Sequence, residues 1–304
     1  MQRIRLKTAV SVLIICAVLF VGFLVYDAYR NRGHEPEIYC DDDYISCSIS
    51  DDNSVLLNGV YAEDAEDGDL TDSIIVESIS KFYEKGRSIV TYAVCDSDGN
   101  VAKHTRMLTY TDYTSPVFSL SQNLTFGYGY TFDLKNYITA TDCIQGDISN
   151  RIKTVLVGDV SSVYNVGVWT VRAKVTNDLG DTSSIDLTVT VTNNDQTIPT
   201  VKLKQYIVYM DKGKTFNPTD FIESVDFDGV TYTDRELLDT VVVRNNVDVS
   251  TPGEYTVEYA YTVAGGSTGK ASMTVIVNPD KDGSADGGQN DMALSGTDSV
   301  GGAI

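Results

Sequence analysis

The feature that most constrains the fold is a pattern that occurs three times in this 304-residue chain. Each copy starts at a glycine, Gly86, Gly167 or Gly253, with spacings of 81 and 86 residues, and continues as an alternation of apolar and polar residues. Period-two alternation is typical of a half-buried β-strand. Glycine-containing turns follow the three copies at residues 98–100, 179–181 and 265–267, and supply the positive-φ positions that a tight hairpin needs. Each copy therefore predicts a β-hairpin that closes a repeated module.

A second shared block lies upstream of the hairpins. Residues 131–142 and 215–226 share a Thr-Phe start, an aromatic-Ile pair and a closing aspartate at the same spacing, and residues 60–64 keep only the end of this block. Gly-Asp-Leu-Thr at 68–71 and Gly-Asp-Ile-Ser at 146–149 follow. Units of about 75 to 85 residues with short alternating strands and hardly any helical periodicity indicate β-sandwiches of immunoglobulin type. We predict an all-β chain of three tandem Ig-like β-sandwiches.

At these residues the sequence resembles the bacterial immunoglobulin-like surface repeat family, which includes the Ig-like domain described from insecticidal crystal toxins. In the first unit Asp64, residues 68–71 and residues 86–100 carry the resemblance, and in the third unit residues 252–259 carry it. The second unit departs from the family pattern at Trp169 and Ala173, and the third lacks the Asp-x-x-Gly-Asn ending. The resemblance covers about residues 38–279 and implies a fold and a surface setting, but no reaction, because one sandwich architecture hosts many functions.

The repeats and the composition between them predict the domain organisation. Polar runs ending in Pro116 and Pro199 separate finished strands from new ones, as short linkers do, and the composition changes to Gly, Ser, Asp and Ala after Val277. The predicted segments are a basic cytoplasmic stub (1–7), a transmembrane helix (8–26), a linker (27–37), repeat 1 (38–113), repeat 2 (114–194), repeat 3 (195–278) and a flexible tail (279–304).

The transmembrane helix is predicted from an uncharged stretch of 19 residues, 8–26, which as a helix would span about 30 Å, the thickness of a bilayer core. Three cations in the first seven residues favour a cytoplasmic N-terminus and export of everything that follows. The alternative is a cleaved signal peptide, whose apolar region is usually about 7 to 15 residues long and ends in small residues. This stretch is longer and ends at Val25 and Tyr26, so we predict a single-pass cell-membrane protein with an extracellular body.

The charge distribution excludes one class of partner. The chain has 23 Lys and Arg against 43 Asp and Glu, and because residues 1–32 hold five cations and one anion, the remainder carries 18 against 42, a net charge of −24. Nucleic-acid affinity depends on Lys and Arg that displace counterions, so no nucleic-acid partner is expected. Only two histidines, His34 and His104, are present, which removes the usual residue of catalytic triads and general bases.

Four cysteines lie beyond the predicted anchor: Cys40, Cys47, Cys95 and Cys143. An even number in an exported region permits two disulfides, with three connectivities. Cys40 with Cys47 would close a small loop, and Cys95 with Cys143 would join neighbouring modules. Four cysteines in a body this long are not a dense disulfide scaffold, so free buried thiols are the open alternative.

Acidic residues gather between residues 63 and 72. Asp64, Glu66, Asp67 and Asp69 are candidate Ca²⁺ ligands, because carboxylate oxygens around a glycine turn suit a cation that takes about six to eight oxygens. The spacing does not match an EF-hand, so only a loop-built site is predicted. The alternative is a solvated acidic loop in which aspartate favours the turn. No other cofactor is expected.

Tyrosine is the most frequent aromatic residue, with 19 copies. Tyr128 and Tyr130 lie beside glycines and are candidate recognition residues, because amphipathic rings stack on sugars or anchor a protein partner. Tyr92, Tyr255, Tyr259 and Tyr261 alternate as core or sheet-face positions do, and such packing is the alternative for the tyrosines in general.

The sequence contains no phosphate loop, nucleophile elbow or Cys/His pair of the known catalytic motifs, so we expect no enzyme activity. Two functions remain. In the first, the extracellular modules bind a protein or a cell-wall or surface glycan, as in adhesion. In the second, they form a structural stalk or spacer without a dedicated ligand, with calcium as a stiffening ion. An exposed aromatic cluster in one module would favour binding, whereas smooth acidic surfaces all round would favour the spacer.

Overall fold

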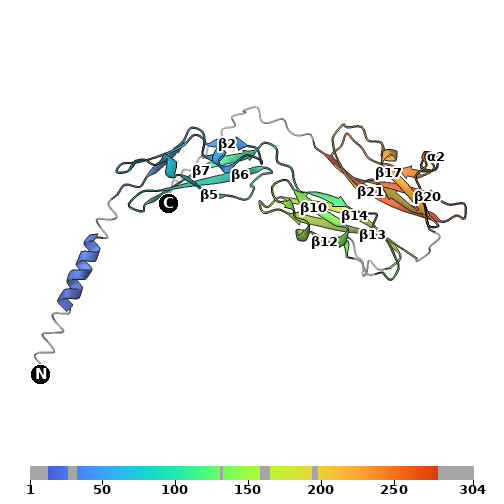
Figure 1. Ribbon diagram of the computed structural model, residues 1–304, viewed down its shortest axis with the longest axis horizontal. Coiled ribbons are helices and arrows are strands. Elements are labelled where there is room, and N and C mark those ends of the chain that lie inside the picture. Colours follow the sequence, from blue (N-terminus) through green and yellow to red (C-terminus); the bar gives the residue numbers. More distant parts are fainter. Residues whose placement is uncertain (1–12, 27–32, 131–132, 158–164, 194–197, 280–304) are drawn as a thin grey trace, which may run out of the picture. The chain divides into compact units, whose positions relative to one another are not determined.

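The computed structural model describes residues 13–26, 33–130, 133–157, 165–193 and 198–279 (Figure 1). Within these residues the strands form six sheets, which occur as three pairs of one three-stranded and one four-stranded sheet. The predicted all-β fold with three similar sandwich-like modules is therefore confirmed. The chain divides into two compact units, unit 1 (Met1–Ser119, Asp133–Val160 and Thr170–Asp186) and unit 2 (Leu120–Phe132, Ser161–Trp169 and Leu187–Ile304).

The first sheet pair lies in unit 1 and coincides with predicted repeat 1, except that β1 begins one residue earlier, at Glu37. Its sheets have the orders β1-β3-β4 and β2-β7-β6-β5. Strands β6 and β7 form an antiparallel hairpin, and β2 runs parallel to β7. The elements are β1 (Glu37–Cys40), β2 (Tyr44–Cys47), η1 (Asn53–Leu57), β3 (Val60–Asp64), β4 (Gly68–Asp69), η2 (Thr71–Ser73), β5 (Ile75–Ile79), β6 (Arg87–Cys95) and β7 (Val101–Tyr110).

The second sheet pair lies within predicted repeat 2, and its strands contribute residues to both units. Its sheets have the orders β11-β10-β8 and β12-β13-β14-β9. The parallel pairing is repeated here between β14 and β9. The elements are β8 (Val117–Leu120), β9 (Thr125–Gly127), η3 (Leu134–Asn136), β10 (Ile138–Asp142), β11 (Gly146–Asp147), η4 (Ser149–Arg151), β12 (Lys153–Val157), β13 (Gly167–Thr176) and β14 (Thr182–Thr192).

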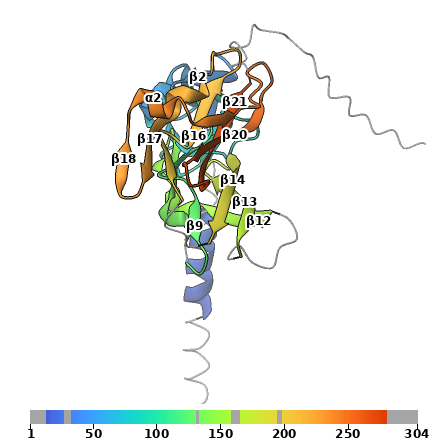
Figure 2. The ribbon, with the colours of Figure 1, turned by 90° about the vertical axis from the view of Figure 1, so that its right-hand side faces the viewer.

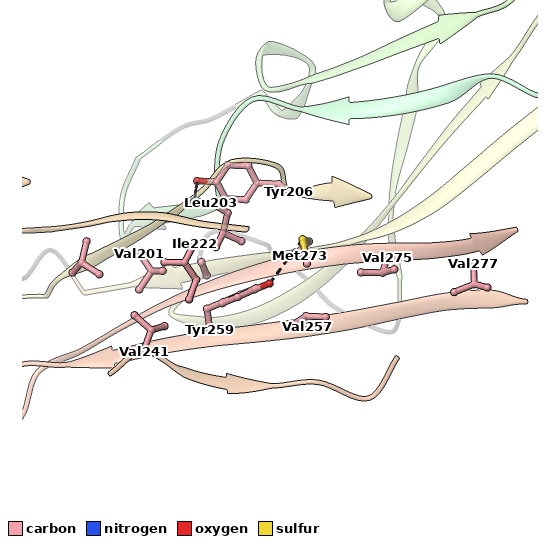
Figure 3. Close-up of a cluster of buried hydrophobic side chains, with 12 residues drawn as sticks. Val201, Leu203, Tyr206, Ile222, Val241, Val257, Tyr259, Met273, Val275 and Val277 are labelled. Atoms are coloured by element: carbon pink, nitrogen blue, oxygen red, sulfur yellow. Dashed lines mark hydrogen bonds between the residues drawn. The ribbon is translucent and has the colours of Figure 1, made fainter. Parts of the chain in front are cut away.

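The third sheet pair lies in unit 2, with the orders β15-β17-β18 and β16-β21-β20-β19. Figure 2 separates β17 and β18 from β20 and β21, which belong to the other layer. Figure 3 shows the core between the layers, in which the Tyr259 hydroxyl points toward the Met273 sulfur, 4.0 Å away. The elements are β15 (Thr200–Leu203), β16 (Ile207–Asp211), η5 (Pro218–Phe221), β17 (Ile222–Phe227), β18 (Val230–Tyr232), α2 (Arg235–Leu238), β19 (Val242–Arg244), β20 (Gly253–Thr262) and β21 (Thr268–Asn278).

The closing hairpins are built alike in all three modules. Gly99, Gly180 and Gly266 have φ angles of 89°, 88° and 87°, a region that side chains with a Cβ rarely occupy. In each turn the glycine N–H donates to the carbonyl three residues before it, at 3.3, 3.2 and 2.8 Å. The positive-φ turns predicted from the three sequence copies are therefore confirmed.

The shared upstream block is not conserved in geometry across all three modules. Asp142 ends β10 on its buried face, but a register shift between Lys202 and Leu203 in the pairing of β15 with β17 inserts one extra residue. A single inserted residue exchanges the two faces of a strand. Asp226 therefore shares a face with Lys202 and pairs with it at 2.6 Å, so its equivalence to Asp142, inferred from identical spacing, is wrong.

Residues 13–26 form a helix whose apolar side chains are exposed. Residues 8–12 of the predicted membrane span, like most of the predicted linker and tail, lie outside the described residues. Among the residues that are described, no helix is both long enough and apolar enough to cross a membrane.

Candidate functional site

An exposed pair of stacked tyrosines lies on the outer face of the first module. Tyr39 of β1 and Tyr61 of β3 are register partners, their ring centroids are 5.7 Å apart and their planes differ by 25°. The residues are 46% and 39% exposed, although aromatic rings of this size normally contribute much of the apolar area that a fold buries. Strand alternation places them here, because the neighbouring Ile38 and Ala62 point to the core.

Three carboxylates lie on the same face, in the next row of outward-pointing residues, two positions along the strands from the tyrosines. Glu37 of β1 is directly opposite Glu63 of β3, and Glu63 is directly opposite Asp69 of β4. All three are exposed. Partial desolvation raises the pKa of the Tyr39 hydroxyl, and the negative charges of Glu63 and Asp69 raise it further. We call this surface the tyrosine–carboxylate face: Glu37, Tyr39, Tyr61, Glu63 and Asp69.

The corresponding outer face of the second module has a different character. Its five positions, read from the exposed residues of β8, β10 and β11, are Val117, Ser119, Thr139, Thr141 and Asp147. A single charge and no aromatic ring remain there. The hydrogen bond at the last position is kept, since Asp147 accepts from the Ser149 N–H at 2.9 Å as Asp69 accepts from Thr71 at 2.9 Å. The tyrosine–carboxylate face is therefore a feature of one module and not of the shared fold.

The four predicted calcium ligands belong to the turn from β3 to β4, and each makes hydrogen bonds within the chain. Asp64 Oδ1 accepts the N–H groups of Glu66 and Asp67, both at 2.8 Å. Glu66 Oε1 pairs with His34 Nδ1 at 2.8 Å, and this contact raises the pKa of His34. Asp67 binds the N–H and hydroxyl of Ser97. Across the described residues no group of three or more His, Cys, Asp or Glu side chains gathers as a metal site requires, so Ca²⁺ binding stays a prediction that the geometry does not support.

All five cysteines are free thiols in the structure, so neither predicted disulfide is formed. Cys47 is buried in the core of the first module, where desolvation raises its pKa, and the same cause raises the pKa of Cys40. Cys95 and Cys143 are exposed. The Cys143 thiol lies 3.0 Å from the Thr114 carbonyl. The alternative of free buried thiols therefore describes Cys47 and in part Cys40, whereas Cys95 and Cys143 are free but exposed.

The tyrosines separate into buried and exposed sets. Tyr92 and Tyr259 are fully buried, as their alternation predicted, and their hydroxyls donate to the carbonyls of Leu56 at 2.7 Å and Pro218 at 2.9 Å. The predicted recognition residues Tyr128 and Tyr130 are 55% and 65% exposed. The core tyrosines are therefore confirmed, whereas a recognition role for Tyr128 and Tyr130 stays a prediction. The Tyr39–Tyr61 pair was missed, although Glu37 and Tyr39 alternate at period two, as do Tyr61 and Glu63.

Within unit 1, a hydrogen-bond network surrounds Tyr113 in the link that follows β7. Its hydroxyl donates to Asp181 Oδ2 at 2.7 Å and accepts from Asn177 Nδ2 at 2.9 Å, and the same amide donates to the buried Asp142 Oδ2 at 3.0 Å. Burial, followed by the bond to Asp181, raises the pKa of Tyr113 strongly. The Phe82 N–H also donates to the Leu179 carbonyl at 2.8 Å. The link is thus held by polar contacts that are partly buried, and the Asn177–Asp142 hydrogen bond beside it is fully buried.

A cavity of about 380 Å³ lies beside this network, also within unit 1. Its lining includes Cys47, Asp142 and Asp178. The Asp178 carboxylate is paired with Arg151 at 2.6 Å, and the Asp142 carboxylate accepts a hydrogen bond from Asn177 at 3.0 Å.

Comparisons with known proteins support the predicted resemblance in part. No family model matches the chain. It is similar to the pesticidal crystal protein Cry22Aa of Bacillus thuringiensis, with 30% identity over 171 residues, which cover 54% of this chain and 22% of that protein. It is also similar to an uncharacterized 81.3 kDa protein of Acholeplasma phage L2, with 29% identity over 144 residues, covering 46% and 19%. The chain spans about a fifth of the length of these relatives.

Two solved structures are also similar. A Clostridium perfringens ZmpB structure of CBM51-2 with GlcNAc and INT domains has 18% identity, a TM-score of 0.21, and coverage of 50% of this chain and 26% of that chain. Drosophila N-cadherin EC1-4 has 13% identity, a TM-score of 0.22, and coverage of 68% and 66%. Scores this low carry no functional argument, so the function has to be inferred from the molecule's own surfaces.

Proposed function

We propose that the chain is a non-catalytic, membrane-anchored surface protein that binds a partner at the cell exterior through the tyrosine–carboxylate face. The observation that carries this proposal is the Tyr39–Tyr61 pair, because the two stacked residues are still 46% and 39% exposed and a partner that covers them would bury that remaining area. Tyr and carboxylates side by side offer both contact area and hydrogen-bond acceptors. A protein segment or a glycan would use both.

The anchor in this proposal is residues 8–26, with the N-terminus in the cytoplasm. The support is the uncharged sequence and the helix of residues 13–26 with its exposed Leu, Ile, Val and Phe side chains. Alkaline carbonate extraction of membranes and protease treatment of intact cells test this part. The proposal expects the full chain to stay with the membrane pellet and its β-modules to be cleaved from outside.

The test of binding compares the full chain in detergent with its Tyr61→Ala variant. Immobilised chain is exposed to surface-protein extracts and to a glycan array, and bound material is quantified. We expect at least one bound partner whose retention falls by about tenfold in the variant. Equal retention by the two proteins, or no retention in either assay, would overturn the proposal. Thr139→Ala, at the corresponding position of the second module, is the matched control.

A spacer is the second candidate, and the Tyr113 network is the observation that favours it. A link held by partly buried hydrogen bonds would stiffen the chain between successive modules, which a stalk requires. The spacer leaves the exposed tyrosine pair without a role. Binding is therefore the function that accounts for more of the observed surface.

A further inference from the structure

The row Glu37–Glu63–Asp69 works against the stability of the sheet that carries it. Like charges directly opposite each other on neighbouring strands destabilise a sheet, and here two such pairs share the central Glu63. The second module shows that the same sheet forms with Val117, Thr141 and Asp147 at these positions. The fold therefore does not require the row.

None of the cations that the structure describes neutralises this row. In the described part of the chain, Glu37, Glu63 and Asp69 take part in no ion pair, and Asp69 accepts hydrogen bonds from Thr71, one of them from its N–H at 2.9 Å. The groups whose charges raise the pKa of Tyr39, after desolvation, are Glu63, Asp69 and Tyr61, and none of them is cationic. Elsewhere the molecule does pair such groups, as Lys202 with Asp226 at 2.6 Å and Lys103 with Glu77.

The tyrosine pair completes a surface with affinity for cations. Lys and Arg are attracted to aromatic faces, and Arg also stacks on them. The Tyr61 hydroxyl lies 3.3 Å from Asp41 Oδ2, which adds a fourth carboxylate at the edge of the pair. Because neighbouring strands are about 4.8 Å apart, the carboxylate row extends over about 10 Å, a length that several side chains of one extended peptide cover.

Resting on the proposed function, we propose that the tyrosine–carboxylate face recognises a basic, extended segment of a partner protein. Its Lys and Arg side chains lie over the Tyr39–Tyr61 rings and along Glu37, Glu63 and Asp69. A neutral glycan stacks on the rings but gains no charge complementarity from three carboxylates. Anionic polymers are repelled by a chain with a net charge of −20.

The experiment measures binding of two probes to the full chain in detergent, a fluorescent nonapeptide of alternating Arg and Ser and a neutral N-acetylglucosamine hexamer. We expect the peptide to bind, and its affinity to fall about threefold in Glu63→Gln and at least about tenfold in Glu37→Gln/Glu63→Gln/Asp69→Asn. Raising the salt concentration weakens peptide binding to the wild type and has less effect on the triple variant. Glu236→Gln on α2 removes one exposed charge elsewhere and is the control.

The outcomes separate this inference from the proposed function. Binding of the sugar hexamer through Tyr61, without peptide binding, overturns the basic partner and leaves the binding function standing. Peptide binding that is unchanged in the triple variant also overturns the inference. Failure of both probes, with no effect of Tyr61→Ala on any retained partner, overturns both. A melting temperature of the triple variant equal to or above that of the wild type shows that its loss of binding is not a loss of fold.

Discussion

The first and second modules present the same sheet with different outer faces. In the first, the five outward positions hold two tyrosines and three carboxylates, and in the second they hold Val, Ser, two Thr and one Asp. The alternation of buried and exposed residues is the same in both sheets: the first, third and fifth residues of β3 and of β10 are buried and the two between them are exposed. This difference shows that packing constrains the residues of the inner face only. The residues of the outer face are therefore better explained by function than by folding.

The largest expected effect comes from an inner position that also differs between the two modules. Tyr92 and Ala173 both lie six residues after the first glycine of their copies, and both are fully buried. Tyr92→Ala places in the first module the alanine that the second module has at this position. The side chains around Tyr92 do not fill the space that the ring leaves. We expect a loss of about 3 to 5 kcal/mol in the stability of this module. Hydrogen exchange should show faster opening of β6 and β7, with β20 and β21 unchanged.

Tyr61→Ala is the matched outer-face control for that experiment. Because Tyr61 packs only on the surface, its removal should change the exchange of the same amides by less than about 1 kcal/mol. Comparable effects of the inner and outer substitutions would contradict the assignment of the two faces.

The next effect concerns a position that holds a different polar residue in each of the two modules. Asn177 of the second module corresponds to Asp96 of the first, and Asn177 donates to Asp142 while the matching Asp64 Oδ2 is buried without a partner. Asn177→Asp should remove the donors to Asp142 and Tyr113 and destabilise the second module by about 1 to 3 kcal/mol. Thermal unfolding followed by the fluorescence of Trp169, on the adjoining β13, measures this loss.

Asn177→Ala separates lost hydrogen bonds from added charge. It should be less destabilising than Asn177→Asp at neutral pH, and the difference should shrink as the pH falls and a carboxylate takes up a proton. An aspartate variant that melts at the wild-type temperature would contradict the role of Asn177.

A smaller effect is expected from exchanging the charges of the outer faces. Glu63→Thr relieves the like-charge contacts with Glu37 and Asp69 and should stabilise the first module by about 0.2 to 1 kcal/mol at low salt. Thr141→Glu places a second carboxylate opposite Asp147 and should destabilise the second module by a similar amount. High salt should reduce both shifts in melting temperature. Shifts of the same sign in the two variants would contradict the argument that the row opposes folding.

The smallest effect tests a feature that the two modules share. Hydrogen bonds from Thr71 and Ser149 lower the pKa values of Asp69 and Asp147. A carboxyl group whose pKa is lowered by folding stabilises the fold above its unfolded pKa of about 4, and this contribution is lost as the pH falls through the folded value. Asp69→Asn and Asp147→Asn should therefore each make melting temperature less dependent on pH below about 4. A variant with an unchanged acid profile would show that its turn does not depend on the carboxylate.

The buried residues of the strands could be predicted from the sequence, because a half-buried strand places an apolar residue at every second position. The hairpins and the burial of Tyr92 and Tyr259 follow from alternation and turn glycines. Asp226 could not be placed, because one inserted residue in β17 reverses its face while leaving the sequence spacing intact. Tyr39 and Tyr61 are 22 residues apart, and only strand register brings their rings together. The acidic turn looked like a metal site because sequence shows the carboxylates but not the N–H groups they accept from.

The central claim is that the tyrosine–carboxylate face of the first module binds a partner and that the same face of the second does not. The most direct measurement is the affinity of the full chain for the basic nonapeptide in two variants: Tyr39→Ser/Tyr61→Thr, which gives the first face the residues of the second, and Val117→Ala/Ser119→Ala, which alters the second face as a control. The account predicts at least about a tenfold loss in the first and no change in the second. Equal affinities of both variants and the wild type would contradict it.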